Sequence, residues 1–417
     1  MSDNDKQKQT KMESSQGASN TEGAKGSELK KNKEKIKGDN KVKSSFIKIP
    51  KGDLLEYRIK RLLFHMGYFP KTNVFIKSSI DDGADPITDL DVYGISVLNN
   101  FSTKTLWADC KSGSVRVHER ISWIKGVKEE ANIDEVLFVA PNVRTTVKQY
   151  AGKSNIRILD VNLIERLEGN YNIAFNDWKG SWNPYEQLGY LNKLSNINVP
   201  TIGLYKKIAK FISTDFWVLD CYSQLKKTIT GIKDLYLGYG VHSDPEVKRI
   251  IKMAIYELIT LLTLAVLTIV KETLYFKDEE KKEIIFDALS SGDIPNKKRK
   301  EIFDAAFRYA YSMIKRSKPD IEIPVEMPVI NITPPNYAPI LFELILRINK
   351  YPTQYTDVLR FIDVSLMEYE LQSKPLDRLY LNKIFNNNDE LIRGVKTILH
   401  FVCEITDIPR AFFMVLE

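Results

Sequence analysis

Cysteine and histidine are scarce in this chain of 417 residues, which contains only three Cys and four His. Three cysteines are too few for a disulfide framework or a zinc cluster, and they fit a reducing, cytoplasmic compartment. The four histidines are far apart in the sequence, so no metal motif is built on His spacing. The cysteines are at positions 110, 221 and 403, and the histidines are at positions 65, 118, 242 and 400.

The N-terminus lacks the apolar segment of a signal peptide. Residues 1–44 are rich in Lys, Ser, Gly, Asn and Gln, with eleven Lys against seven acidic residues. Such a segment cannot bury enough apolar surface to offset the entropy lost on ordering, which predicts a disordered tail. The tail carries +4 of the net charge of +7, a mild basic bias that permits a polyanionic partner without requiring one.

Long hydrophobic runs are rare as well. The strongest covers residues 253–270, but it includes Glu257, and its uncharged part is shorter than the roughly 20 residues that cross a bilayer. The run is apolar around its whole circumference, which predicts a helix buried within the protein or at an oligomer interface. We therefore expect a cytoplasmic protein that makes no membrane contact.

Residues 45–170 alternate between helical and strand-like periodicity. Residues 53–66 place five apolar side chains on one helical face, and Gly67 follows where a helix would end. Strands are predicted at 73–77, 90–97, 104–111, 135–140 and 156–160, and further helices at 118–131, 145–151 and 163–167. The order α-β-β-β-α-β-α-β-α predicts an α/β module with a mixed central sheet that is flanked by helices.

After a connector at residues 171–202, the chain is dominated by helical periodicity. Residues 203–417 are therefore predicted to form an all-α domain, which we expect to act in sensing, partner binding or oligomerisation. Helices are predicted at 243–276, 279–289, 298–315, 338–349, 355–370 and 389–405. Six prolines between residues 319 and 339 predict an extended connector within this domain.

The residues that indicate chemistry lie in the segments ITDLDVYGI and WADCKSG. Alternate residues of a strand share one face, so Asp109 and Lys111 point the same way, and Cys110 points to the opposite face as a small buried apolar residue. A hairpin between the two strands would bring Asp91 beside Asp109. Asp89 is two residues earlier on the same face and is an alternative to Asp91.

A third carboxylate is available from the first helix. Glu56 falls next to Leu63 at the edge of the apolar arc, whereas Asp53 points further into solvent. Clustered carboxylates with a Lys are the groups that metal-assisted phosphodiester hydrolysis requires. Hard oxygen ligands hold Mg²⁺, the metal lowers the pKa of a bound water, and the ammonium group neutralises developing charge.

The pattern of Asp91 followed by Asp109-Cys110-Lys111, within this order of elements, resembles the PD-(D/E)xK motif of restriction-endonuclease-like nucleases. The resemblance covers residues 46–168, and the pattern is similar to those of type IV restriction enzymes and Holliday-junction resolvases. The sequence departs from the motif at one position, because Leu90 stands where the motif name has Pro. It implies that Asp91, Asp109 and Glu56 bind Mg²⁺, which Mn²⁺ can replace, and that these three residues and Lys111 are catalytic.

The function implied by this resemblance is a metal-dependent DNA endonuclease, such as a restriction or anti-phage defence enzyme. Two alternatives stay open at this point. One is a repair or recombination nuclease that acts on branched DNA, and the other is a non-catalytic module that binds nucleic acid or protein. Basic residues of the two helices after the Asp109 strand, including Arg120, could contact phosphates, but interleaved Glu residues favour ordinary solvated helix faces for most of them.

Overall fold

A computed structural model describes residues 49–77, 86–174, 183–197, 203–291, 296–318 and 333–416. The predicted disordered tail at 1–44 lies outside these residues, as do parts of the predicted connectors at 171–202 and 319–339. By their contacts, residues 47–417 form one compact unit. The domain limits expected from the sequence, 45–170 and 203–417, stay predictions.

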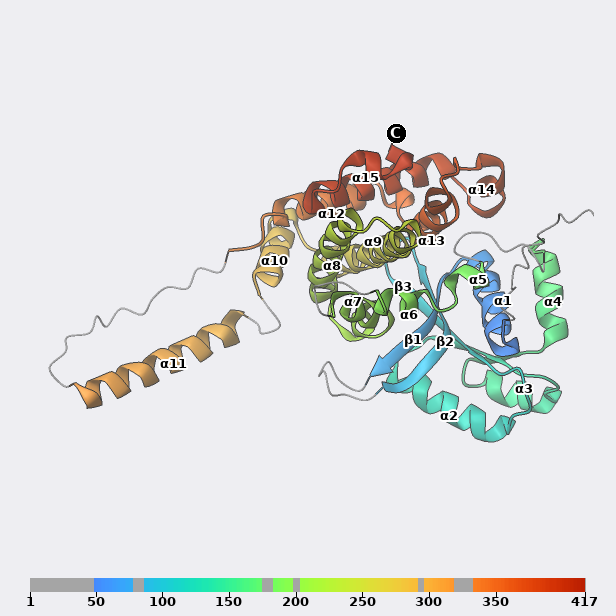
Figure 1. The fold of residues 1–417 in the computed structure, drawn as a ribbon. Coiled ribbons are helices and arrows are strands. Elements are labelled where there is room, and N and C mark those ends of the chain that lie inside the picture. Colours follow the sequence, from blue (N-terminus) through green and yellow to red (C-terminus); the bar gives the residue numbers. More distant parts are fainter. Residues whose placement is uncertain are drawn as a thin grey trace, which may run out of the picture. The chain divides into compact units, whose positions relative to one another are not determined.

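The N-terminal region is built on a five-stranded mixed sheet in the order β1-β2-β3-β4-β5 (Figure 1). The first three strands pair antiparallel, and β3, β4 and β5 pair parallel. The strands are β1 (Phe69–Lys77), β2 (Pro86–Val97), β3 (Thr103–Cys110), β4 (Glu135–Val139) and β5 (Ile156–Leu159). The helices are α1 (Lys51–His65), α2 (Val117–Glu130), α3 (Thr145–Gly152) and α4 (Val161–Asn170). The predicted element order and the mixed sheet are confirmed.

Different helices cover the two faces of the sheet. On one face, Ile59 of α1 and Ile164 of α4 pack with Ala108 and Cys110 of β3. On the other face, Ile121 of α2 packs in a separate cluster that includes Trp107, Phe138 and Ala151. Because Cys110 and Trp107 belong to opposite faces, the alternation predicted for the β3 strand is present.

The C-terminal region is helical, as predicted. The helices are α5 (Pro184–Gln187), α6 (Tyr190–Ser195), α7 (Leu204–Ser213), α8 (Cys221–Val241), α9 (Pro245–Thr273), α10 (Asp278–Ser290), α11 (Asn296–Ser317), α12 (Ala338–Lys350), α13 (Val358–Val364), α14 (Arg378–Ile384) and α15 (Asn388–Thr406). Short 3₁₀ turns are η2 (Asp215–Val218), η3 (Pro352–Gln354), η5 (Glu370–Gln372), η6 (Arg410–Phe412) and η7 (Met414–Leu416). The single helix predicted at 355–370 is wrong, since α13 continues as a π-helical segment, η4 (Ser365–Tyr369), and then as η5.

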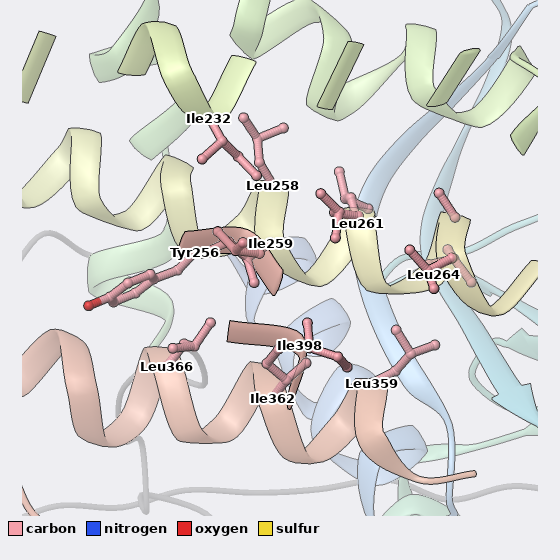
Figure 2. Packing of buried hydrophobic residues seen from close by; sticks show 14 of the residues in the cluster. Ile232, Tyr256, Leu258, Ile259, Leu261, Leu264, Leu359, Ile362, Leu366 and Ile398 are labelled. Atoms are coloured by element: carbon pink, nitrogen blue, oxygen red, sulfur yellow. The ribbon is translucent and has the colours of Figure 1, made fainter. Parts of the chain in front are cut away.

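Helix α9 is the core element of this region. Its residues Leu258, Leu261 and Leu264 pack among side chains of α8, α13 and α15 (Figure 2). Asp244 caps its N-terminus through a hydrogen bond from the backbone amide of Glu246, and Pro245 occupies its first turn. Within the described residues, α9 is the one helix long and apolar enough to cross a membrane, and 94% of its most apolar stretch is buried in the protein. The prediction of a buried helix is confirmed.

The amphipathic pattern of α1 suggests that its polar side is exposed, but in the structure that side is largely buried. Arg58 donates to Glu168 of α4 at 2.6 Å, and Lys60 donates to Gln187 of α5 at 2.6 Å. Arg360 of α13 donates to the backbone oxygen of Phe64. The core of the helical region also includes Phe64 and other side chains from the sheet region, so α1 is covered on both sides.

Candidate functional site

The β2–β3 hairpin places the two strand carboxylates together. Val92 is paired with Ala108, so Asp91 and Asp109 are the next residues along this antiparallel register. Asp91 accepts a hydrogen bond from the Cys110 backbone amide at 2.7 Å, which fixes its carboxylate against β3. Asp109 is fully buried and Asp91 is nearly so.

The Lys111 ammonium lies between these two carboxylates. Its Nζ is 3.1 Å from Asp91 Oδ2 and 3.1 Å from Asp109 Oδ1. Burial disfavours its positive charge, but Asp109 and Asp91 more than compensate, so the pKa of Lys111 is raised. The structure therefore brings together Asp91, Asp109 and Lys111, three of the four residues that the sequence selects.

Asp109 has a further partner that the sequence interpretation missed. Arg120 of α2 forms two hydrogen bonds to the Asp109 carboxylate, one of them from Nε at 2.8 Å. The guanidinium also stacks on the indole of Trp123, 3.6 Å from the ring centre. Arg120 is thus no solvated surface residue. Arg120 and Trp123 are one helical turn apart on the helix that follows β3, and this Arg-x-x-Trp spacing is the sequence signal that could have identified the contact.

Glu56 of α1 is close enough to the strand carboxylates to interact with them electrostatically. Burial raises the pKa of Glu56 to about 8, and the negative charge of Asp91 adds to the shift. Asp53 and Asp89 raise it further, whereas the Lys111 ammonium lowers it. Burial also raises the pKa of Asp91, against the opposing effects of Lys111 and the Cys110 amide. These carboxylates oppose one another's ionisation, which is the environment that a divalent cation relieves.

Asp91 and its alternative as metal ligand, Asp89, have different environments in the structure. Asp91 is buried and hydrogen-bonded to Lys111, whereas Asp89 is exposed and lies at the wall of a cavity. Asp53, which the helical pattern directs toward solvent, is half-buried at the same cavity wall.

The raised pKa of Glu56 predicts a pH-dependent stability. Between its ordinary pKa of 4.5 and about 8, the folded protein keeps a proton on Glu56 that the unfolded chain releases, so the free energy of unfolding falls as the pH rises. A Glu56→Gln variant should therefore melt at a higher temperature than the unaltered protein at pH 8 without divalent cations. This gain should shrink toward pH 5. Thermal unfolding across this pH range measures it.

The exposed Glu119 of α2 provides a matched control for this substitution. Glu119→Gln should leave the melting temperature nearly unchanged at every pH. A gain for Glu56→Gln that is the same at pH 5 and pH 8 would contradict the assignment of the shift to Glu56.

The carboxylates fit a bound Mg²⁺ only in part. Asp91 and Glu56 are mutually repelling oxygen donors of the kind that Mg²⁺ prefers. Both oxygens of Asp109 are instead held by Arg120. In the described parts of the chain, no three His, Cys, Asp or Glu side chains are already arranged as a metal centre.

A cavity of about 770 Å³ adjoins the carboxylate cluster. Glu56 and Asp53 of α1 and Asp89 of β2 contribute to its wall, and so do residues of β1, α6, α7 and α9. One of its walls contains the buried ion pair between Lys71 of β1 and Glu257 of α9. Glu56 is therefore the residue through which the carboxylate cluster meets a space that the sheet and the helical region line together, because Asp91, Asp109 and Lys111 are not part of the cavity lining.

In comparisons with protein-family models, curated proteins and solved structures, this chain has no match. The chemistry of the site rests on its own residues.

Proposed function

We propose that this protein is a Mg²⁺-dependent DNA endonuclease that acts in the cytoplasm, as a restriction or anti-phage defence enzyme. The observation that carries the proposal is the Lys111 ammonium held 3.1 Å from each of two buried carboxylates on adjacent strands. A surface ion pair needs no second carboxylate and no burial, whereas phosphodiester hydrolysis uses both a cation and acidic ligands. Mn²⁺ is expected to replace Mg²⁺.

Each residue has a separate role in this proposal. Asp91 and Glu56 would hold the metal, with Asp109 beside them as the third acidic residue. A metal bound there would supply a water of lowered pKa and offset charge on the phosphate. Lys111 stays protonated at neutral pH because of its two carboxylates, so it is suited to orient the attacking water or neutralise charge in the transition state.

The helical region at 203–417 is proposed to control the nuclease by sensing, by binding a partner protein or by forming a homo-oligomer. Its contact with the site region is direct, since Arg360 of α13 holds the C-terminal turn of α1, the helix that bears Glu56.

A cleavage assay with several DNA forms tests the proposal. Supercoiled plasmid, nicked, single-stranded and branched DNA are incubated with Mg²⁺, Mn²⁺ or EDTA. We expect cleavage with either metal, none with EDTA, and none by the Lys111→Ala variant. Preferential cleavage of branched DNA would instead establish the repair or recombination alternative.

One observation favours the non-catalytic alternative. The bidentate bond from Arg120 neutralises Asp109 and is a stable structural contact in its own right. If DNA is bound but never cleaved with either metal, the endonuclease proposal is wrong, and the carboxylate cluster is a structural part of a binding module.

A further inference from the structure

The 770 Å³ cavity beside the carboxylates is larger than the candidate catalytic cluster needs. Pockets of about 300–1,000 Å³ typically enclose one small ligand. A DNA duplex, whose major groove alone is about 12 Å wide, does not fit within such a space. A single nucleotide that has left its stack does fit.

The walls of the cavity have the groups that bind an unpaired nucleotide. Tyr57, Tyr190 and Trp217 are aromatic residues of its lining. Tyr57 is buried, whereas Tyr190 and Trp217 are half-buried, and bases stack on accessible aromatic rings without sequence preference. Trp217 is held in place, because its Nε1 donates to the Ile212 backbone oxygen at 3.0 Å and its ring packs edge-on against Phe216. A fixed ring offers a stacking surface without first being ordered.

The charges of the lining suit a phosphate that enters together with a metal. Lys71 and Glu257 neutralise each other, so three carboxylates remain near the cluster: Asp53, Glu56 and Asp89. Exposed Lys206 of α7 also lines the cavity and would attract the strand, and the lining includes Lys210, which is paired with Asp215. Without a divalent cation, the carboxylates of Asp53 and Asp89 would repel a phosphate placed beside them.

We propose that this cavity receives an unpaired nucleotide of the DNA substrate, so that the strand cut at the Asp91–Lys111 cluster is single-stranded or locally unpaired. This inference rests on the proposed nuclease function and names its substrate class. Glu56 is the link, since it belongs both to the cavity wall and to the carboxylate cluster. A nucleotide in the cavity would thus have its phosphodiester next to Glu56, the candidate metal ligand that the cavity and the cluster share.

The first test compares DNA forms of one sequence. A labelled single strand, a duplex with an internal unpaired bubble and a perfect duplex are incubated with the full-length protein and Mg²⁺. We expect the unpaired forms to be cleaved at least about tenfold faster, since one base–aromatic stack accounts for about this factor. Equal rates on all three forms would overturn the inference while leaving the nuclease proposal intact.

The second test obstructs the cavity. Asn192 of α6 is exposed and lines the cavity, whereas its exposed neighbour Lys193 does not. Asn192→Trp should slow cleavage of the single strand about tenfold, and Lys193→Trp should stay within about twofold of the unaltered protein. Two neighbouring lysines of α7, one inside and one outside the cavity lining, provide a second comparison that does not depend on Asn192. Lys206→Glu should weaken single-strand cleavage, while Lys207→Glu, outside the lining, should not.

Binding of a labelled single strand, followed by fluorescence anisotropy with Ca²⁺ present, separates this inference from the nuclease proposal. If no DNA form is cleaved with any metal, the nuclease proposal is wrong. Binding of an unpaired nucleotide in the cavity is then still supported if Asn192→Trp weakens binding relative to Lys193→Trp, and it is overturned if the two variants bind equally.

Discussion

Replacing Asp91 with Asn should reduce DNA cleavage by at least about 100-fold, with little change in the melting temperature. Asn keeps an oxygen that can accept the hydrogen bond from the Cys110 amide, but it removes the negative charge that would face the proposed metal. Lys111 keeps its second partner, Asp109, at 3.1 Å. Cleavage rates on plasmid DNA with Mg²⁺, together with thermal unfolding, measure both effects.

Asp89→Asn is the matched control because this residue is two positions earlier on the same strand and was the alternative ligand. Asp89 is exposed and makes no ion pair among the described residues, so its substitution should reduce cleavage far less. The opposite ranking, with Asp89→Asn inactive and Asp91→Asn active, would show that the metal ligand is misassigned. Asp109→Ala is a poorer probe, since it deprives Arg120 of its partner and confounds activity with folding.

Glu257→Ala should destabilise the protein by about 3–5 kcal/mol. Glu257 and Lys71 are both buried, and each is the ion-pair partner of the other between α9 and β1. Removing one carboxylate leaves an uncompensated ammonium group in a site that is largely shielded from water, which is the costly way to break such a pair. Urea unfolding at pH 7 measures the loss.

Two further variants test this explanation. The double substitution Lys71→Met and Glu257→Leu removes both charges and should recover most of the lost stability. Glu246→Ala, which breaks an exposed pair with Lys193 at the start of the same helix, should cost no more than about 0.5 kcal/mol. If Glu257→Ala unfolds at the same urea concentration as Glu246→Ala, the ion pair does not have the energetic role assigned to it.

The arrangement of the sheet region could be predicted from the sequence because its apolar periodicity is local. Alternation in β3 and the helical arc of α1 are each complete within one element, so the element order was predicted correctly. The same local pattern also indicated which residues of β3 share a face, and hence the proximity of Asp109 and Lys111.

The partners of buried charged residues could not be predicted in this way. Arg58 and Glu168 are 110 positions apart, and nothing local distinguishes them from solvated residues. Arg120 was grouped with basic residues that could contact phosphates or lie on solvated helix faces for the same reason, since its Asp109 partner belongs to another element. The break within residues 355–370 was also missed, because a π-helical segment keeps the apolar content of a helix and changes only its hydrogen bonding.

The hydrogen bond from Arg360 to the Phe64 backbone oxygen couples the position of α1 to that of α13. Glu56 and Phe64 are two turns apart on one continuous α-helix, and such a rod transmits a displacement from one end to the other with little bending. Arg360 donates a hydrogen bond to the Phe64 backbone oxygen, and its Nε also donates to Asp357 Oδ1 at 2.6 Å, at the start of α13. A shift of α13 by a fraction of an ångström would therefore move the Glu56 carboxylate by a similar distance relative to Asp91. In the proposed nuclease, the position of Glu56 would then be set in part from outside the sheet, by the packing of α13 against α1.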